Sequence, residues 1–358
     1  MKHREQGDLQ LSSFESRLCL SKYSKDHGQP GSSRAGESMI ENLLDEIGNA
    51  KSIGITGHVR PDGDCVGSVL GMYAYLTNVY KDAVIKIFLE TPPNYFEFMK
   101  GYDKIDTTFA YPGQFDVFIS LDAGDIERID KAGKLFLGAK KSICIDHHVS
   151  NKGFGDVCHL EPDASSTCEI LTRMFKDEYM DVDVAKALYT GIAHDTGIFR
   201  FSCTGVDTFI ALSKLVKYDF DGSRITDETF LQKTYVQNQV LGRSLLESIL
   251  FMDGRCIASS MDKRAMDFYG VDGKDLEGIV NQLQVTKGVE VAIFMYEIGT
   301  LEHKVSMRSN GVVDVSRVAA YFGGGGHVRA AGCNMHGTFY DVIKNLTLHI
   351  EAQLNEAE

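Results

Sequence analysis

The sequence predicts an α/β protein with a doubly wound, mainly parallel sheet in its larger domain and a smaller α/β domain after it. Three observations indicate this fold class. From residue 51 onward, short apolar segments of strand length alternate with segments whose apolar residues recur at helical spacing, as in a parallel sheet whose strands are joined by helices. At 358 residues the chain is long for one domain. Its apolar fraction of 43% is enough for a sizeable core.

The first domain is expected at residues 39–225. It follows a polar segment, residues 1–38, that shows no sustained period and that we interpret as a disordered N-terminal extension. An amphipathic helix pattern begins at Met39. The apolar runs predict strands at 52–56, 84–89, 117–121 and 142–145, and the helical spacings predict helices at 65–80, 167–176, 184–199 and 208–217.

Residues 226–252 are expected to form a helical linker, and residues 253–358 a smaller substrate-binding domain. Ligands of doubly wound sheets bind beyond the carboxyl ends of the strands. We therefore expect the active site at that edge of the first domain, in the cleft between the two domains. In the second domain the pattern predicts strands at 256–260, 289–298 and 304–307, and helices at 276–283, 315–322 and 340–354.

Charge and composition exclude several classes of protein. A net charge of −13 without any basic run argues against a protein that coats long nucleic acid. No segment approaches the roughly 20 apolar residues of a membrane helix. The eight cysteines form no CxxC pair, and several lie in strand-like runs, so we expect reduced thiols in the cytoplasm. An anionic substrate would need local cations, which bound metal ions would supply.

The first candidate site residues follow the predicted strand at 52–56. His58, Asp62 and Asp64 lie close together in the loop that leads into the next helix. Burying two neighbouring carboxylates without cations is costly, so a metal ion would explain this cluster. The sequence Pro-Asp-Gly-Asp is also good turn sequence, so the segment taken alone is equally typical of a solvated turn.

Further candidates follow later elements. Asp122 ends the third predicted strand of this domain. The triplet Asp146-His147-His148 ends the fourth. Each has an ordinary alternative, because an Asp after a strand often caps the next helix and adjacent histidines are often surface residues. Asp195 lies among apolar residues in a helical pattern, where an unpaired carboxylate is costly, although a helix cap is an alternative. The ordinary explanations would have to hold independently at every position, so a shared metal site is favoured.

These pieces, in this order, resemble the DHH phosphoesterase superfamily, which is named for the triplet that is here Asp146-His147-His148. The resemblance spans roughly residues 51–335. It implies two divalent cations bridged by Asp122; mixed carboxylate and imidazole ligation suits Mn²⁺, with Mg²⁺ or Co²⁺ as alternatives. It also implies that His148 and Arg128 face the phosphoryl group. The implied ligands are His58, Asp62 and Asp122 for one cation, and Asp64, Asp122, His147 and Asp195 for the other.

A glycine run at residues 323–326, followed by His327, lies in the second domain. Glycines let a backbone approach a ligand closely and expose N–H groups to an anion, although such a run is more often a flexible loop. With Ala330-Ala331-Gly332 after it, the run resembles the C-terminal domain of one DHH subfamily. That resemblance implies nucleotide binding by Gly324, Gly325, Gly326 and His327, together with Arg308 and Ser309.

The two-domain arrangement resembles the nanoRNase/pAp phosphatase branch of the superfamily. This implies hydrolysis of short oligoribonucleotides to mononucleotides, and dephosphorylation of 3′-phosphoadenosine 5′-phosphate (pAp) to AMP, by metal-activated water. The expected partners are short RNA or a small nucleotide, with no long nucleic acid and no membrane, and a homodimer is an open option. Two alternatives stay open: a soluble hydrolase of cyclic or linear dinucleotides (c-di-AMP or pApA), and a non-catalytic nucleotide sensor.

Overall fold

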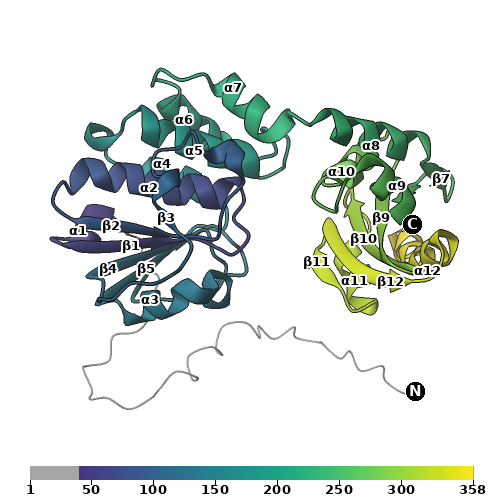
Figure 1. Cartoon of the computed structure of the whole chain (residues 1–358), viewed down its shortest axis with the longest axis horizontal. Helices are drawn as coiled ribbons and strands as arrows, with labels where there is room; N and C mark the ends of the chain where they lie inside the picture. The colour runs from purple at the N-terminus through teal and green to yellow at the C-terminus, as the bar shows by residue number, and fades with distance from the viewer. Residues whose placement is uncertain (1–39, 358) are drawn as a thin grey trace, which may run out of the picture. The chain divides into compact units, whose positions relative to one another are not determined.

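The computed structural model describes residues 40–357, so the extension predicted at residues 1–38 lies outside the described residues. The chain forms two compact units, one ending at Phe220 and the other beginning at Asp221 (Figure 1). Each unit is built around a six-stranded sheet. The predicted fold class, a doubly wound parallel sheet followed by a second α/β domain, is confirmed.

The first sheet is parallel throughout, with the strand order β3-β2-β1-β4-β5-β6. Its strands are β1 (Ser52–Thr56), β2 (Val84–Phe88), β3 (Ile105–Asp106), β4 (Val117–Leu121), β5 (Lys141–Asp146) and β6 (Val157–Leu160). The central strands β1, β4 and β5 are almost wholly buried, which is why they occur in the sequence as continuous apolar runs. The strand order reverses between β1 and β4, and ligands bind at such a point beyond the carboxyl ends of the strands.

Helices cover both faces of this sheet. They are α1 (Leu43–Ile47), α2 (Gly63–Val79), α3 (Gly133–Gly138), α4 (Thr167–Met174), α5 (Val182–Asp195) and α6 (Val206–Leu215). Helices α2, α4 and α5 pack together on one face, and α3 lies on the other (Figure 1). The Asp62 carboxylate caps α2 by accepting the N–H groups of Asp64 and Cys65. Within residues 40–357, no helix combines the length and apolar character needed to cross a membrane.

The outer strands β3 and β6 are not predicted from the sequence. Strand β3 has only two residues, too few for a periodic pattern. Strand β6 reads Val-Cys-His-Leu and lies at the edge of the sheet. Its His159 is buried, and its ring is satisfied there because Nδ1 accepts the N–H of Ile40 at 3.0 Å and Nε2 lies 2.6 Å from Glu161. Because this buried residue is polar, it interrupts the apolar run from which a strand would be predicted.

The segment expected as a helical linker, residues 226–252, is less uniform than predicted. Helix α7 (Gly222–Thr226) continues into a π-helical turn (Asp227–Leu231), and α8 (Tyr235–Leu246) begins at its N-cap Thr234. The last part forms an edge strand, β7 (Ile249–Phe251), of the second sheet. A short apolar run is compatible with either a strand or a helix. The predicted helical segment therefore ran past the end of α8 into the residues that form β7.

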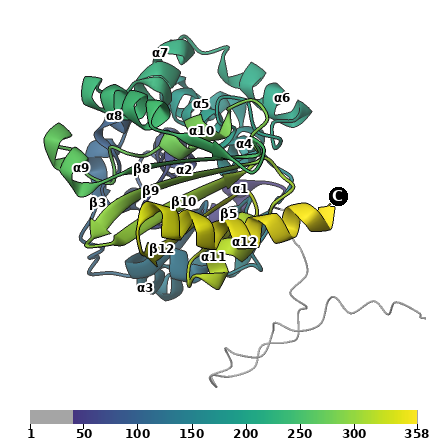
Figure 2. The same cartoon turned by 90° about the vertical axis from the view of Figure 1, so that its right-hand side faces the viewer.

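The second sheet has the strand order β11-β12-β10-β9-β8-β7 and is antiparallel except between β8 and β9. Its further strands are β8 (Cys256–Met261), β9 (Val291–Gly299), β10 (Glu302–Ser309), β11 (Gly325–His327) and β12 (Ala330–His336). One face packs on α11 (Val315–Tyr321) and α12 (Phe339–Ala357), and Figure 2 shows α12 lying along it. The other face packs on α8, α9 (Lys263–Tyr269) and α10 (Ile279–Gln284). The glycine run, for which a flexible loop was the ordinary alternative, is in part the strand β11.

Candidate metal centre and anion pocket

Polar side chains gather at the carboxyl edge of the first sheet. The loop after β1 leads into α2, Asp122 follows β4 directly, and the two histidines follow β5. Helix α5, which packs against α2, ends in Asp195. Because β1 and β4 flank the point where the strand order reverses, this is the edge at which a ligand site is expected. The residues that the structure brings together here are the predicted metal ligands His58, Asp62, Asp64, Asp122, His147 and Asp195.

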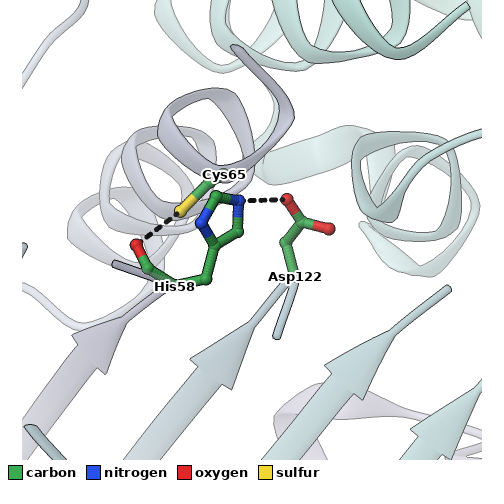
Figure 3. A group of neighbouring side chains, drawn as sticks. All are labelled: His58, Cys65 and Asp122. Atoms are coloured by element: carbon green, nitrogen blue, oxygen red, sulfur yellow. Dashed lines mark hydrogen bonds and ion pairs between the residues drawn. The ribbon is translucent and has the colours of Figure 1, made fainter. Parts of the chain in front are cut away.

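His58 faces two carboxylates. Its Nε2 lies 3.6 Å from Oδ1 of Asp62 and 3.6 Å from Oδ2 of Asp122, and Figure 3 shows the imidazole directed at Asp122. Its Nδ1 lies 2.8 Å from the carbonyl oxygen of Val59. Only an N–H satisfies a carbonyl oxygen, so the neutral ring presents its lone pair on Nε2. Burial opposes protonation, but the two carboxylates raise the pKa of His58.

His147 faces the other side of the same carboxylate. Its Nε2 lies 3.5 Å from Oδ1 of Asp122 and 3.3 Å from Oδ2 of Asp195. Oδ2 of Asp64 is 3.9 Å away. The Nδ1 atom of His147 lies 3.2 Å from the carbonyl oxygen of Ala164, which again directs the lone pair to Nε2. Asp122 thus offers one oxygen to His58 and the other to His147.

The donor set fits divalent cations. Asp64 and Asp122 are only 1% and 2% exposed. Burial, with the nearby charges of Asp122 and Asp195, raises the pKa of Asp64 well above its ordinary value. Burial also raises the pKa of Asp195 to about 7. Burial opposes protonation of His147, but the carboxylates around it raise its pKa to about 10. The raised pKa values of Asp64 and Asp195 mean that cations would stabilise the ionised forms of these two carboxylates, so the cluster is suited to metal ions.

Cys65 lies beside His58 and Asp122 (Figure 3), with the potential ligand atoms of all three within 4.8 Å of one another. Its Sγ lies 3.7 Å from the backbone carbonyl oxygen of His58 and is directed at it. Burial raises the pKa of the thiol well above its ordinary value. In this geometry the thiol donates to the backbone instead of presenting a lone pair to the cluster, and carboxylate oxygens are the better ligands for hard divalent cations.

His148 is held by a carboxylate that the sequence did not single out for a role of its own. Nδ1 of His148 donates to Oδ1 of Asp146 at 2.7 Å, and this bond raises the pKa of His148. Asp146 is fully buried, and its Oδ2 accepts from Nδ2 of Asn151 at 2.7 Å. With Nδ1 engaged, Nε2 is the ring atom of His148 that is available to a ligand.

Two further residues in contact with the cluster were missed by sequence reasoning. The backbone N–H groups of Thr167 and Cys168 donate to the two oxygens of Asp64, at 2.7 and 3.0 Å. The hydroxyl of Thr167 donates to Oδ1 of Asp122 at 3.2 Å. The first turn of α4 therefore holds both carboxylates in place. The sequence signal was the Ser-Ser-Thr segment, typical of a helix N-cap, whose Ser166 caps α4.

Arg128, predicted to face phosphate, lies beside the cluster. Its Nη2 is 3.5 Å from Nδ1 of His58. Its backbone carbonyl accepts the N–H of Val59 at 2.8 Å. The backbone bond connects the 3₁₀-helix after β4 (Ile126–Ala132) to the loop after β1, and the guanidinium lies next to the face of the cluster that His58 occupies.

The second domain contains a cavity of about 620 Å³, within the usual range for small-ligand sites. The predicted residues Arg308, Gly324 and Gly325 line it, together with Lys304 and Phe322. Nε of Arg308 donates to Oδ1 of Asn281 at 2.8 Å, and Nη1 donates to a backbone carbonyl at 3.0 Å. The guanidinium is thereby held in one orientation. Neither Asn281 nor Lys304 carries a pattern that would identify it in the sequence.

The other predicted nucleotide-binding residues are placed differently. Ser309 is fully buried, and its hydroxyl donates to Oε1 of Glu290 at 3.0 Å. The same oxygen accepts the N–H groups of residues 311–313, so Ser309 belongs to a fixed turn. Gly326 and His327 lie on β11 and, among the described residues, are not part of the cavity lining. His327 is exposed.

Family models match most of both domains. Residues 52–192 match the DHH family N-terminal domain, and residues 254–356 match the DHHA1 domain. The first match contains every candidate metal ligand except Asp195. The second contains the cavity and the glycine run.

Known proteins are similar to this chain in sequence or in structure over most of its length. The bifunctional oligoribonuclease and PAP phosphatase NrnA of Bacillus subtilis is 25% identical over 325 residues, which cover 89% of this chain and all of that protein. The protein of the same description from Thermus thermophilus is 28% identical over 80% of this chain and 85% of its own length. The crystal structure of an exopolyphosphatase-related protein from Bacteroides fragilis matches with a TM-score of 0.78 and 27% identity, over 86% of this chain and 94% of that one.

Proposed function

The chain belongs to the DHH family of phosphoester-hydrolysing enzymes, and we propose that it hydrolyses short oligoribonucleotides to mononucleotides and dephosphorylates pAp to AMP. The observation that carries the two-metal part of this proposal is the position of Asp122, whose two oxygens face His58 and His147 separately. The substrate part is supported by the relatives described as bifunctional oligoribonuclease and PAP phosphatase, which match over 89% and 80% of this chain.

The proposed site holds two divalent cations, with Mn²⁺ favoured because imidazole and carboxylate donors are mixed. Asp62 rather than Cys65 completes the first set, since the Cys65 thiol is directed at the carbonyl oxygen of His58 whereas Asp62 faces Nε2 of His58. When bound, the cations polarise the phosphoryl group and acidify the attacking water. The proposed ligands are His58, Asp62 and Asp122 for one cation, and Asp64, Asp122, His147 and Asp195 for the other.

His148 and Arg128 act on the phosphoryl group in this proposal. Asp146 holds the His148 ring by Nδ1 and favours its protonated form. The protonated ring donates from Nε2 to a phosphoryl or leaving oxygen, where negative charge develops in the transition state. Arg128, next to His58, adds a second cationic donor on the same side. Burial opposes ionisation of Asp146, but the hydrogen bonds from His148 and Asn151 lower its pKa.

The second domain binds the part of the nucleotide that does not react. Arg308, held by Asn281, grips a phosphate. The N–H of Gly324 donates to the carbonyl oxygen of Ala319, so the glycine run at 324–326 contributes by letting the backbone approach the anion closely. His327, which is exposed on β11 outside the cavity lining, contacts the part of the nucleotide that extends out of the cavity. Ser309 contributes through the turn that it shares with Glu290. Binding energy of this kind positions the reacting phosphate as well as holding the substrate.

One set of assays tests the proposed substrates. Wild-type protein with Mn²⁺ is given pAp, pApA, c-di-AMP and a five-nucleotide RNA, and specificity constants are compared. We expect turnover of pAp and of the RNA to exceed that of c-di-AMP. Preference for c-di-AMP or pApA would instead identify a dinucleotide hydrolase. Binding without turnover of any of the four would identify a nucleotide sensor.

A further inference from the structure

We propose that Lys304 binds a second backbone phosphate, so that the second-domain cavity favours oligonucleotides over pAp. The proposal rests on the function proposed above and specifies the substrate class that this cavity selects. Lys304 and Arg308 both line the cavity, and none of the described residues that line it is Asp or Glu. In a chain of net charge −13, such a cavity is a local positive site that suits a polyanion.

The two cationic side chains of the cavity, Lys304 and Arg308, are well separated along one strand. Lys304, Ser306 and Arg308 all line the cavity. They alternate along β10 with buried neighbours, so they share one face of the strand. Four residues of a strand span about 13 Å. Because Arg308 is held against Asn281 at one end of this span, Lys304 at the other end is placed to bind a second phosphate.

The two cationic side chains also differ in how firmly they are held. Arg308 is fixed by Asn281 and by a backbone carbonyl. Lys304 is exposed, and no carboxylate within residues 40–357 forms an ion pair with it. A fixed guanidinium suits a phosphate that every substrate presents in the same place. A mobile ammonium acts as a point charge for a phosphate whose position varies.

Substrate chemistry indicates which molecule needs Lys304. pAp carries one phosphate that reacts and one that does not, and Arg308 accounts for the second. Lys304 is then surplus for pAp but matches an additional phosphate of an oligonucleotide. Phe322, in the same cavity, offers an aromatic surface on which a base of the longer substrate stacks.

The experiment compares pAp with the trinucleotide pApApA. Specificity constants are measured for the wild type, Lys304→Ala and Lys304→Arg over a series of KCl concentrations. Lys344→Ala is the matched control, because it removes an exposed lysine of the same domain from α12, outside the cavity. We expect Lys304→Ala to lower the ratio of trinucleotide to pAp specificity constants about tenfold, the loss of one charge-assisted hydrogen bond. The salt slope for the trinucleotide should fall by about 0.7, the value for one phosphate contact in a single strand.

Each outcome decides the proposal. Lys304→Arg should keep the wild-type ratio and salt slope, and so should Lys344→Ala. An unchanged ratio in Lys304→Ala, with active wild type, overturns the role of Lys304 and leaves the proposed function standing. A wild type that hydrolyses neither substrate overturns both. Melting temperatures of all variants show whether a loss of activity reflects a folding defect. If Lys304→Ala folds poorly, the ratio of trinucleotide to pAp specificity constants is measured for Lys304→Gln instead.

Discussion

At the scale of single residues, Asp122 is the group on which both cations are proposed to depend. Asp122→Asn removes the shared charge but keeps the shape, and Asn tolerates the left-handed backbone found here (φ 55°). We expect turnover to fall by several orders of magnitude while the melting temperature holds or rises, since carboxylate repulsion is relieved. Steady-state kinetics and Mn²⁺ calorimetry measure both effects. If more than about a tenth of the activity remains, a loss under about 1.4 kcal/mol, the shared-ligand assignment is wrong.

A second residue-scale prediction separates Cys65 from the ligands. Because its thiol is buried and bound to a backbone carbonyl, Cys65→Ala should keep two Mn²⁺ per chain. His58→Ala, which removes a proposed ligand next to it, should bind one Mn²⁺ less. Calorimetric stoichiometry distinguishes the two variants without any activity assay. Loss of one ion in Cys65→Ala would make the thiol a ligand.

The candidate ligands were accessible to sequence reasoning because each follows a strongly apolar segment. Asp122 and His147 come directly after buried strands, so their side chains had to meet at one edge of the sheet. The supporting groups were not accessible. Thr167 and Asn151 reach the cluster through contacts of the folded chain, and no local pattern marks such contacts. Ser309 shows the converse, because a sequence resemblance did not reveal that its hydroxyl is engaged with Glu290.

At the scale of secondary structure, the glycine run illustrates what a sequence pattern leaves open. Glycine has low β-propensity, so nothing in the run itself indicates the pairing of β11 with β12. In contrast, β1 and β4 were predicted with their observed bounds, because buried parallel strands are apolar throughout. Buried central strands can therefore be predicted from sequence, whereas edge strands held mainly by backbone pairing cannot.

The close approach of β11 to β12 gives a prediction for this element. A Cβ on Gly326 would lie 2.4 Å from the carbonyl oxygen of Ala330, on a backbone with φ of 147°. Gly326→Ala should therefore destabilise the second domain by about 2 kcal/mol. Gly325→Ala is the matched control, since its Cβ would meet nothing within 4 Å. Urea unfolding of the full chain compares the two, and equal midpoints would show that β11 adapts.

At the scale of the whole molecule, charge is unevenly distributed between the chain and its cavity. The net charge is −13, yet the described lining of the second-domain cavity includes two cationic side chains, Lys304 and Arg308, and no carboxylate. A short anion interacts mainly with such a local site. A long strand also extends over the surrounding surface, where the average field repels it and no basic run counteracts the repulsion.

This distribution predicts how activity depends on RNA length. Specificity constants should rise from the dinucleotide to the few nucleotides that the cavity accommodates, and should then decline as further phosphates lie over a surface of unfavourable charge. Salt should reduce the penalty for long RNA, because screening weakens repulsion between exposed charges. A ladder of RNAs, assayed with Mn²⁺ at low and at physiological ionic strength, measures both trends. Undiminished cleavage of long RNA at low salt would contradict this prediction. It would require a basic groove that follows the RNA backbone, as in a processive exonuclease.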